Sequence, residues 1–159
     1  MTEIIVRALH PEDDRSGFSS GDEDLDRFFR KYAGQNQFKH HLGVTYVATA
    51  GEVICGFVTV SAGSIEIEDL PVLRLARLAT APAVRGIGVG KLLLRFALQL
   101  ACDMSDELGC VGVVVDAKED AVSFYERYGF ESFPALEGES NARPAPQPMF
   151  LPLGSIPRG

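Results

Sequence analysis

The sequence predicts an α/β fold with a mixed sheet, and three observations support this prediction. The 159 residues have an ordinary globular composition, 46% hydrophobic and 23% charged, so the chain can bury a core rather than remain disordered. Two runs rich in valine and threonine, Val44 to Thr49 and Val53 to Ser61, predict a strand hairpin. A long helical pattern begins near Gly88, and the short apolar run Val111 to Asp116 after it is typical of a buried parallel strand.

The N-terminal segment predicts one strand and one helix. Ile4 to Leu9 has the pattern of a first strand, and Ser20 with Glu23 three residues later has the spacing of a capping box. At 100° per residue, the helix that follows separates an apolar face from a basic face. The apolar set is Leu25, Phe28, Phe29 and Tyr32, and the basic set is Arg27, Arg30 and Lys31.

Two further helices and a strand are predicted in the second half. Val72 to Thr80 has a strand pattern that Pro82 stops. The long helix ends before Gly109 and keeps a 3.6-residue period through Val89, Leu92, Leu93, Phe96, Ala97, Leu100 and Met104. A shorter helix, Ala121 to Tyr128, is stopped by Gly129.

The C-terminal segment predicts two closing strands. These are Phe130 to Phe133 and Met149 to Leu153, and the Pro-rich stretch Glu137 to Pro148 separates them. With no long linker in the sequence, residues 1–159 are expected to form a single domain.

Charge and cysteine content restrict the class of protein. The start lacks a signal-peptide layout and no apolar run is long enough to span a membrane, so we expect a soluble, cytoplasmic protein. The three cysteines, Cys55, Cys102 and Cys110, lack metal-ligand spacing and are expected to be buried thiols, with no metal bound.

The charges are unevenly distributed along the chain. The net charge is -7, yet Arg27 to Lys39 and Leu70 to Cys102 together hold nine basic residues and no acid, which leaves -16 for the remainder. A distribution of this kind can present a basic face to phosphates on an acidic protein.

The most informative segment is the glycine-rich turn Arg85-Gly86-Ile87-Gly88-Val89-Gly90-Lys91, between a strand and the long helix. Glycines allow close approach of the backbone, and the unpaired N–H groups of a helix start bind anions. The P-loop pattern fails because Arg85 and Leu92 stand where it needs Gly and Ser or Thr. The dinucleotide pattern G-x-G-x-x-G fails as well, because these glycines run as G-x-G-x-G. A pyrophosphate is the predicted ligand, with Arg85 and Lys91 adding charge.

Arg85-x-x-Gly88-x-Gly90 resembles the acetyl-CoA signature of the GNAT superfamily of N-acetyltransferases. The resemblance extends to Arg77-Leu78-Ala79-Thr80, to Val113 to Ala117 and to Ala121 to Phe130, in the order of the family. It implies a twisted, mostly antiparallel mixed sheet with about four helices, in which a parallel strand pair splays apart to admit acetyl-CoA. The cofactor-binding residues that it implies are Leu78, Ala79, Thr80, Arg85, Gly86, Ile87, Gly88, Val89, Gly90, Lys91 and Phe124.

Tyr125 is the expected catalytic residue. Spacing alone favours a packing tyrosine, since Phe124 and Tyr128 are close by. The resemblance places the matching tyrosine of GNAT enzymes near the thioester sulfur, where its phenol can protonate the departing thiolate. No general base is evident, although His40 and His41 are candidates that more often are simply solvated.

Outside the cofactor segment the chain is similar to a branch of the superfamily, the TacT-like toxins encoded with ribbon-helix-helix antitoxins. The matching pieces include Phe18-Ser19-Ser20-Gly21, Thr45-Tyr46-Val47, Val115 to Lys118 and Met149 to Leu153. The resemblance implies acetylation of the α-amino group of aminoacyl-tRNA, an antitoxin partner and a homodimer. The candidate tRNA-binding residues are Arg27, Arg30, Lys31 and Lys39.

Two other functions stay open at this point. One is a GNAT enzyme that acetylates a small amine or a protein N-terminus, and the other is an acetyl-CoA-binding module without catalysis. The isoelectric point of about 4.9 is lower than is usual in the toxin branch, which weighs against tRNA. Tyr125 and the intact Arg85 to Gly90 segment weigh against the non-catalytic module.

Overall fold

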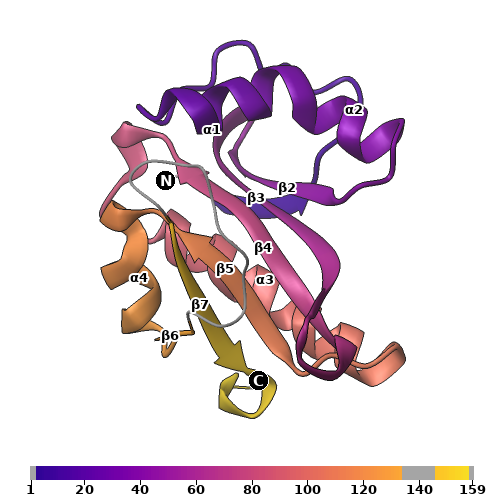
Figure 1. Ribbon diagram of the computed structural model, residues 1–159. Helices are drawn as coiled ribbons and strands as arrows, with labels where there is room; N and C mark the ends of the chain where they lie inside the picture. The colour runs from indigo at the N-terminus through magenta and orange to yellow at the C-terminus, as the bar shows by residue number, and fades with distance from the viewer. Residues whose placement is uncertain (1–2, 134–145, 158–159) are drawn as a thin grey trace. The chain divides into compact units, whose positions relative to one another are not determined.

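The computed structural model describes residues 3–133 and 146–157, and Figure 1 shows the path of the chain. Backbone hydrogen bonds connect seven strands of these residues in the order β1-β2-β3-β4-β5-β7-β6. The pairs β1–β2, β2–β3, β5–β7 and β6–β7 are antiparallel. Strands β4 and β5 are parallel, with Leu73, Arg74 and Leu75 opposite Val113, Val114 and Val115. The predicted mixed sheet is therefore confirmed.

The strands and helices lie close to their predicted positions. The strands are β1 Ile4–Ala8, β2 Val44–Ala50, β3 Val53–Ile65, β4 Leu70–Thr80, β5 Gly112–Ala117, β6 Glu131–Ser132 and β7 Gln147–Pro152. The helices are α1 Glu23–Arg27, the π-helix η1 Phe28–Tyr32, α2 Ala33–Phe38, α3 Val89–Glu107 and α4 Val122–Arg127. Because α1, η1 and α2 follow one another without a break, the described residues form three helical bodies where about four helices were predicted. The predicted stretch Glu137 to Pro148 lies mostly outside the described residues.

The chain packs as two compact units. Unit 1 comprises Met1–Ser61 and Ala76–Ala97, and unit 2 comprises Ala62–Leu75 and Leu98–Gly159. Strands β3 and β4 and helix α3 contribute residues to both units. No helix among the described residues combines the length and the apolar composition that a membrane span requires.

The core of unit 1 lies between the N-terminal helices and the sheet. Figure 1 shows α1 and α2 lying above β2 and β3. Phe28 and Phe29 point inward from the helices, and the ring of Phe29 stacks on that of Phe57 of β3 with a centroid distance of 4.5 Å. Phe18 packs edge-on against both Phe29 and Phe57. These rings fix the helices to the strands by burying aromatic surface.

Two predictions for the N-terminal helix are wrong. The N-cap is Asp22 rather than Ser20, and its carboxylate accepts from the backbone N–H groups of Asp24 and Leu25. Tyr32, predicted to face the core, is 44% exposed, while Ala33 is buried. The π-helix explains this difference, because its wider turn shifts the inward-facing position by one residue.

Helix α3 buries a stripe that is displaced from the predicted one. Leu93 and Ala97 are fully buried as predicted, together with Leu94 and Ala101. Leu92, predicted to be buried, is 38% exposed. The period was therefore predicted correctly, and the stripe is centred about one position later in the sequence.

Unit 2 carries the parallel pair and helix α4. Val72, Val114 and Ile65 form a buried cluster, and Figure 1 shows α4 beside β5 and β7. Gly109 after α3 and Gly129 after α4 have φ of +105° and +95°, which confirms both predicted helix ends. All three cysteines are free and buried, as predicted.

Candidate functional site

The glycine-rich turn is a compact link between β4 and α3. The N–H of Arg85 donates to the Pro82 carbonyl (3.2 Å) and that of Ile87 to the Val84 carbonyl (3.3 Å). The Gly88 carbonyl accepts from the N–H of Leu92 at 2.9 Å, so Gly88 opens the hydrogen-bonded ladder of α3. The N–H groups of the first turn have no acceptor within a helix, so they are available to an anion.

Gly86 and Gly88 give this turn its open surface. Their φ angles are +88° and +90°, a region in which a β-carbon is costly. A Cβ built at either position meets no atom of the described residues within 4 Å. Val89, the first residue of α3, is only 3% exposed and anchors the turn to the core. The turn therefore presents uncovered backbone at a helix start, the kind of surface to which a pyrophosphate binds.

The strand segment Leu78 to Thr80 leads into the turn. Ala79 is 5% exposed. Its carbonyl would lie 3.0 Å from a Cβ at Gly56 of β3, so β3 and β4 can approach this closely because residue 56 is glycine. The N–H of Ala81 donates to the Cys55 carbonyl at 2.9 Å, which joins the end of β4 to β3. Leu78 and Thr80 are half-buried.

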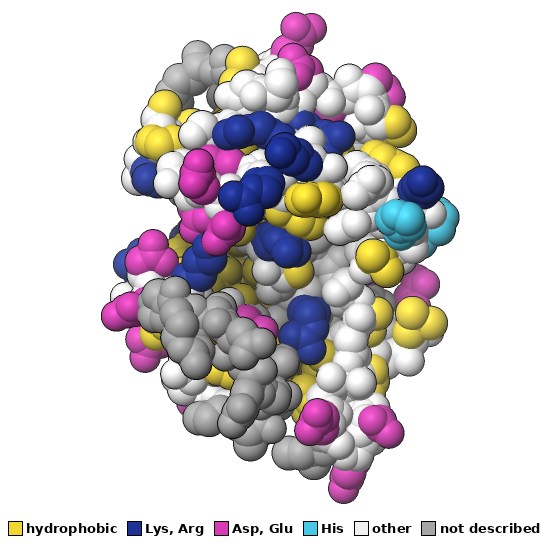
Figure 2. All heavy atoms as spheres, turned by 45° about the horizontal axis from the view of Figure 1, so that its top comes forward, with side chains coloured by type: hydrophobic (Ala, Val, Ile, Leu, Met, Phe, Trp, Pro, Cys, Tyr) yellow, Lys and Arg dark blue, Asp and Glu magenta, His cyan; other side chains and the backbone are white. Residues whose placement is uncertain are grey.

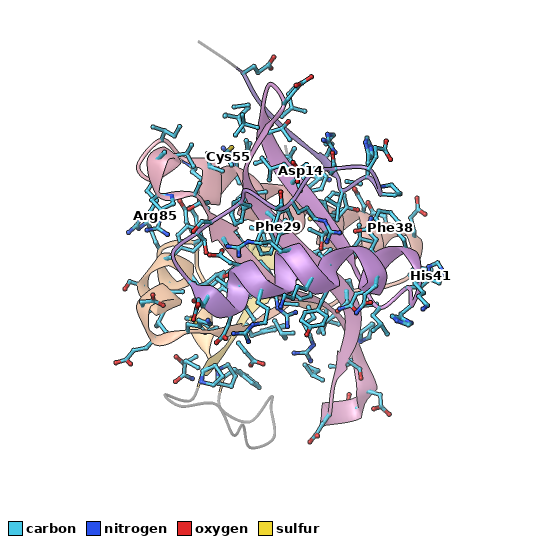
Figure 3. The ribbon with its side chains drawn as sticks, turned by 90° about the horizontal axis from the view of Figure 1, so that it is seen from above. Asp14, Phe29, Phe38, His41, Cys55 and Arg85 are labelled. Atoms are coloured by element: carbon cyan, nitrogen blue, oxygen red, sulfur yellow. The ribbon has the colours of Figure 1, made fainter. Side chains whose placement is uncertain are left out.

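The Arg85 side chain connects the turn to the first helix. Its guanidinium donates to the Ser20 carbonyl and, at 3.5 Å, to the Thr80 carbonyl. Figure 3 shows Arg85 near the start of α1. Arg85 was predicted to add charge beside a pyrophosphate, and in the structure its guanidinium also ties the Phe18-to-Gly21 loop to the end of β4.

A buried carboxylate organises that loop. Asp26 is 4% exposed, and its Oδ1 accepts from the Ser20 N–H at 2.8 Å and the Ser20 hydroxyl at 2.7 Å. Its Oδ2 lies 3.7 Å from the Arg30 guanidinium, whose Nε donates to the Phe18 carbonyl at 3.0 Å. Asp26 therefore fixes both the loop and one of the candidate tRNA-binding arginines.

The candidate tRNA-binding residues of α1 and η1 line a polar hollow of about 420 Å³, whose walls are Ser19, Gly21, Glu23, Asp26, Arg27, Arg30 and Lys31. Lys and Arg side chains gather over this part of the surface in Figure 2. The hollow is less basic than predicted, because Arg27 lies 3.6 Å from Asp24 and Arg30 lies near Asp26. These carboxylates offset part of the positive charge.

Lys39 and the adjacent histidines lie apart from this hollow. All three side chains are exposed, and Figure 3 shows His41 beyond the far end of α2 from Arg85. The structure thus brings Arg27, Arg30 and Lys31 together and leaves Lys39 at the other end of the helix. His40 and His41 are likewise separated from the glycine-rich turn.

Tyr125 lies in α4 of unit 2 and is 4% exposed. Its ring packs edge-on against Phe124 (centroids 5.2 Å apart) and Phe130 (5.3 Å). Burial in this aromatic setting raises the pKa of the Tyr125 phenol above its ordinary value. The phenol therefore stays protonated at neutral pH, as a proton donor must.

Sequence reasoning missed two residues near these features. Asp26 occupies an inward position three residues before Phe29, and an acid at such a position is a signal of a buried polar pair. Arg77 of β4 places its guanidinium carbon 3.8 Å from the centroid of the Phe28 ring. No sequence signal links Arg77 with Phe28, because β4 and η1 are far apart in the sequence and come into contact only in the folded chain.

Comparisons with known proteins agree with this geometry. Residues 41–132 match the family described as Acetyltransferase (GNAT) domain. A relative named tRNA-acetylating toxin, from Mycobacterium tuberculosis (strain ATCC 25618 / H37Rv), is 31% identical over 141 residues, which cover 80% of this chain and 84% of the relative.

Two solved structures share the fold over almost the whole chain. The crystal structure of AtaTR bound with AcCoA has a TM-score of 0.80 and 27% identity, covering 96% of this chain and 95% of that one. The structure of AtaT complexed with acetyl-methionyl-tRNAfMet has a TM-score of 0.78 and 25% identity, covering 97% of both chains. By these matches the chain belongs to the GNAT acetyltransferases, in the branch of the tRNA-acetylating toxins.

Proposed function

We propose that this protein transfers the acetyl group of acetyl-CoA to the α-amino group of aminoacyl-tRNA and thereby acts as a toxin that blocks translation. The observation that supports acetyl-CoA binding is the open turn at Gly86 and Gly88, where two glycines with positive φ leave the backbone uncovered at a helix start. The acceptor is supported by the relative named tRNA-acetylating toxin and by the AtaT complex with acetyl-methionyl-tRNAfMet.

All but one of the residues that would hold acetyl-CoA belong to unit 1. Backbone N–H groups from Gly88 to Lys91 would bind the pyrophosphate, and Lys91 adds an exposed cation. Backbone groups of Leu78 to Thr80 would pair with the pantetheine amides, and N–H groups near Ala79 and Thr80 would stabilise the oxyanion. Phe124 of unit 2 is proposed as a further cofactor contact. When bound, acetyl-CoA supplies an activated acetyl thioester.

Tyr125 is the proposed general acid. Its phenol holds the proton that the departing thiol needs, and its raised pKa keeps that proton in place until thiolate forms. The α-amine nitrogen becomes positively charged as its bond to the acetyl carbon forms, and it gives up a proton to the tyrosinate as the thiol leaves and the neutral amide forms. The free α-amine has a pKa of about 8, below that of a buried tyrosine. An amine of this pKa is partly free at neutral pH, which makes a strong general base unnecessary.

The partners proposed for the chain follow from its branch. Besides aminoacyl-tRNA, these are a ribbon-helix-helix antitoxin and a second copy of the chain in a homodimer. Arg27, Arg30 and Lys31 would contact tRNA phosphates, with Lys39 as a more distant contact. The substrate also places the protein in the cytoplasm, where aminoacyl-tRNA is found.

The proposal is tested with purified charged tRNA and radiolabelled acetyl-CoA. Wild type should label the aminoacyl group, and Tyr125→Phe should bind acetyl-CoA as before while losing acetyl transfer by about 10²-fold or more. The variant keeps the ring packing against Phe124 and Phe130, so a loss of activity without a loss of stability identifies proton transfer.

A charge variant tests the acceptor in the same assay. Replacing Arg27, Arg30 and Lys31 with glutamine should reduce the labelling of charged tRNA. The remaining labelling should also fall less steeply as the salt concentration rises. Labelling of free amines or peptides, with charged tRNA untouched, would instead support an ordinary GNAT enzyme.

A further inference from the structure

Arg77 is held in one orientation by the aromatic core of unit 1. Its guanidinium lies over the Phe28 ring at 3.8 Å, and Phe28 in turn stacks on Phe57 with centroids 6.3 Å apart. Phe28 is 6% exposed and Phe57 is fully buried, so the surface under the guanidinium is rigid. An arginine stacked on a fixed ring keeps its planar donors pre-oriented.

The charge of Arg77 is not balanced by a carboxylate among the described residues. Arg7 pairs with Asp13, Arg27 with Asp24 and Arg30 with Asp26, whereas no described acid lies within ion-pair distance of Arg77. The side chain is half-buried, and this desolvation lowers the pKa of the guanidinium, with no acidic neighbour acting to raise it. A desolvated cation without a counter-charge costs stability, which is characteristic of a binding group.

The position of Arg77 relates it to the acceptor rather than to the cofactor phosphates. It precedes Leu78 on β4, the segment proposed to bind pantetheine, and it shares a strand face with Ala79, which packs in the same core cluster as Phe28. The anion-binding turn begins only at Arg85, beyond the end of the strand. Arg77 instead contacts η1, whose exposed residues Arg30 and Lys31 line the proposed tRNA surface.

We propose that Arg77 binds a backbone phosphate of the single-stranded 3′ end of the acceptor tRNA and so positions its aminoacyl group; this inference rests on the proposed function. The amine to be acetylated is at the 3′ terminus, so the phosphates nearest to it must approach the strand that carries the thioester. Arg77 lies on that strand directly before the segment proposed to bind pantetheine, and its side chain contacts η1, which carries Arg30 and Lys31. A guanidinium matches phosphate with two parallel hydrogen bonds.

The test compares two variants of Arg77 with a control at Arg95, which is an exposed arginine of α3. Arg77→Met keeps an apolar stem over Phe28 and removes the charge, Arg77→Lys keeps the charge, and Arg95→Met removes an equal charge elsewhere. For each enzyme, KM for charged tRNA is measured between 50 and 200 mM salt at saturating acetyl-CoA, together with kcat and the Kd for acetyl-CoA. These salt limits are roughly those over which phosphate contacts dominate the change in affinity.

We expect Arg77→Met to raise KM for charged tRNA about tenfold and to lower the slope of log KM against log salt by about 0.7, as for one phosphate contact on a single strand. Arg77→Lys should restore the slope, and Arg95→Met should resemble wild type. The Kd for acetyl-CoA should not change in any variant.

Three results would overturn the inference. Equal behaviour of Arg77→Met and Arg77→Lys would show that Arg77 only packs on Phe28. An unchanged KM and slope in Arg77→Met would exclude a phosphate contact, and a changed Kd for acetyl-CoA would place Arg77 at the cofactor. If wild type does not acetylate charged tRNA at all, the proposed function itself fails, which the same assay reveals before any variant is compared.

Discussion

Replacing Gly88 tests the cofactor site most directly, because two separate costs can be worked out for it. At φ +90° a side chain is strained by about 1–2 kcal/mol, which lowers the free energy of unfolding. The Cβ also projects into space that holds no atom of the described residues, where the pyrophosphate would approach the backbone. Displacing the ligand from two N–H donors, at about 1.5 kcal/mol each, costs about 3 kcal/mol.

The expected result for Gly88→Ala is therefore a loss of roughly 10²-fold in acetyl-CoA affinity. Gly88→Val, with a bulkier branched side chain, should abolish measurable binding. Wild type should bind acetyl-CoA at low micromolar levels or tighter, and isothermal titration calorimetry measures all three proteins.

Gly51 provides the matched control. It lies in the β2–β3 hairpin turn of the same unit, has φ +63°, and a Cβ there also meets no described atom within 4 Å. Gly51→Ala should lose a similar free energy of unfolding in urea denaturation and keep the affinity of wild type. If Gly88→Ala binds acetyl-CoA as wild type does, or if Gly51→Ala loses affinity to the same extent, the placement of the pyrophosphate is wrong.

Two further predictions concern stability and assembly. Hydrogen bonding to Arg7 lowers the pKa of Asp13 to about 2, so the pair stabilises the fold above pH 4 and this contribution disappears as the pH falls towards 2. Asp13→Asn should therefore lower the free energy of unfolding by about 1 kcal/mol at pH 7 and by much less at pH 2.5, and an equal loss at both values in urea denaturation would contradict this. A homodimer should appear in light scattering at twice the chain mass, and a single species of 17.2 kDa would exclude it.

The elements that the sequence predicted well are those with a regular period or a distinctive end. Helix α3 repeats its apolar positions for several turns, and Gly109 and Gly129 mark helix ends because only glycine adopts their φ cheaply. The parallel strand β5 is a continuous apolar run, as burial on both faces requires. The glycine-rich turn lies between β4 and α3 as predicted, because its glycines are adjacent in the sequence and mark the turn locally.

The features that were missed depend on tertiary contacts or on a change of period. The π-helix at Phe28–Tyr32 moved Tyr32 outward, and a constant angle of 100° cannot represent such a turn. Ser20 is followed by an acid at the correct spacing for a capping box, yet its hydroxyl donates to Asp26 because that carboxylate is buried beside it. Arg77 appeared only as a strand residue, since its contact with Phe28 forms between distant parts of the chain.

The acidity of the protein changes how its basic residues can act on RNA. Charges further apart than about 8–10 Å are screened at physiological salt, so a net charge of -7 does not by itself prevent a local contact with phosphate. On α1 and η1, however, Arg27 and Arg30 already lie beside Asp24 and Asp26, and a phosphate must compete with these carboxylates. Such a surface attracts tRNA only weakly at long range and binds few of its phosphates. Selection of the acceptor must therefore depend more on fixed groups close to the reacting amine, and Arg77 is a half-buried cation of the described residues whose charge no neighbouring carboxylate offsets.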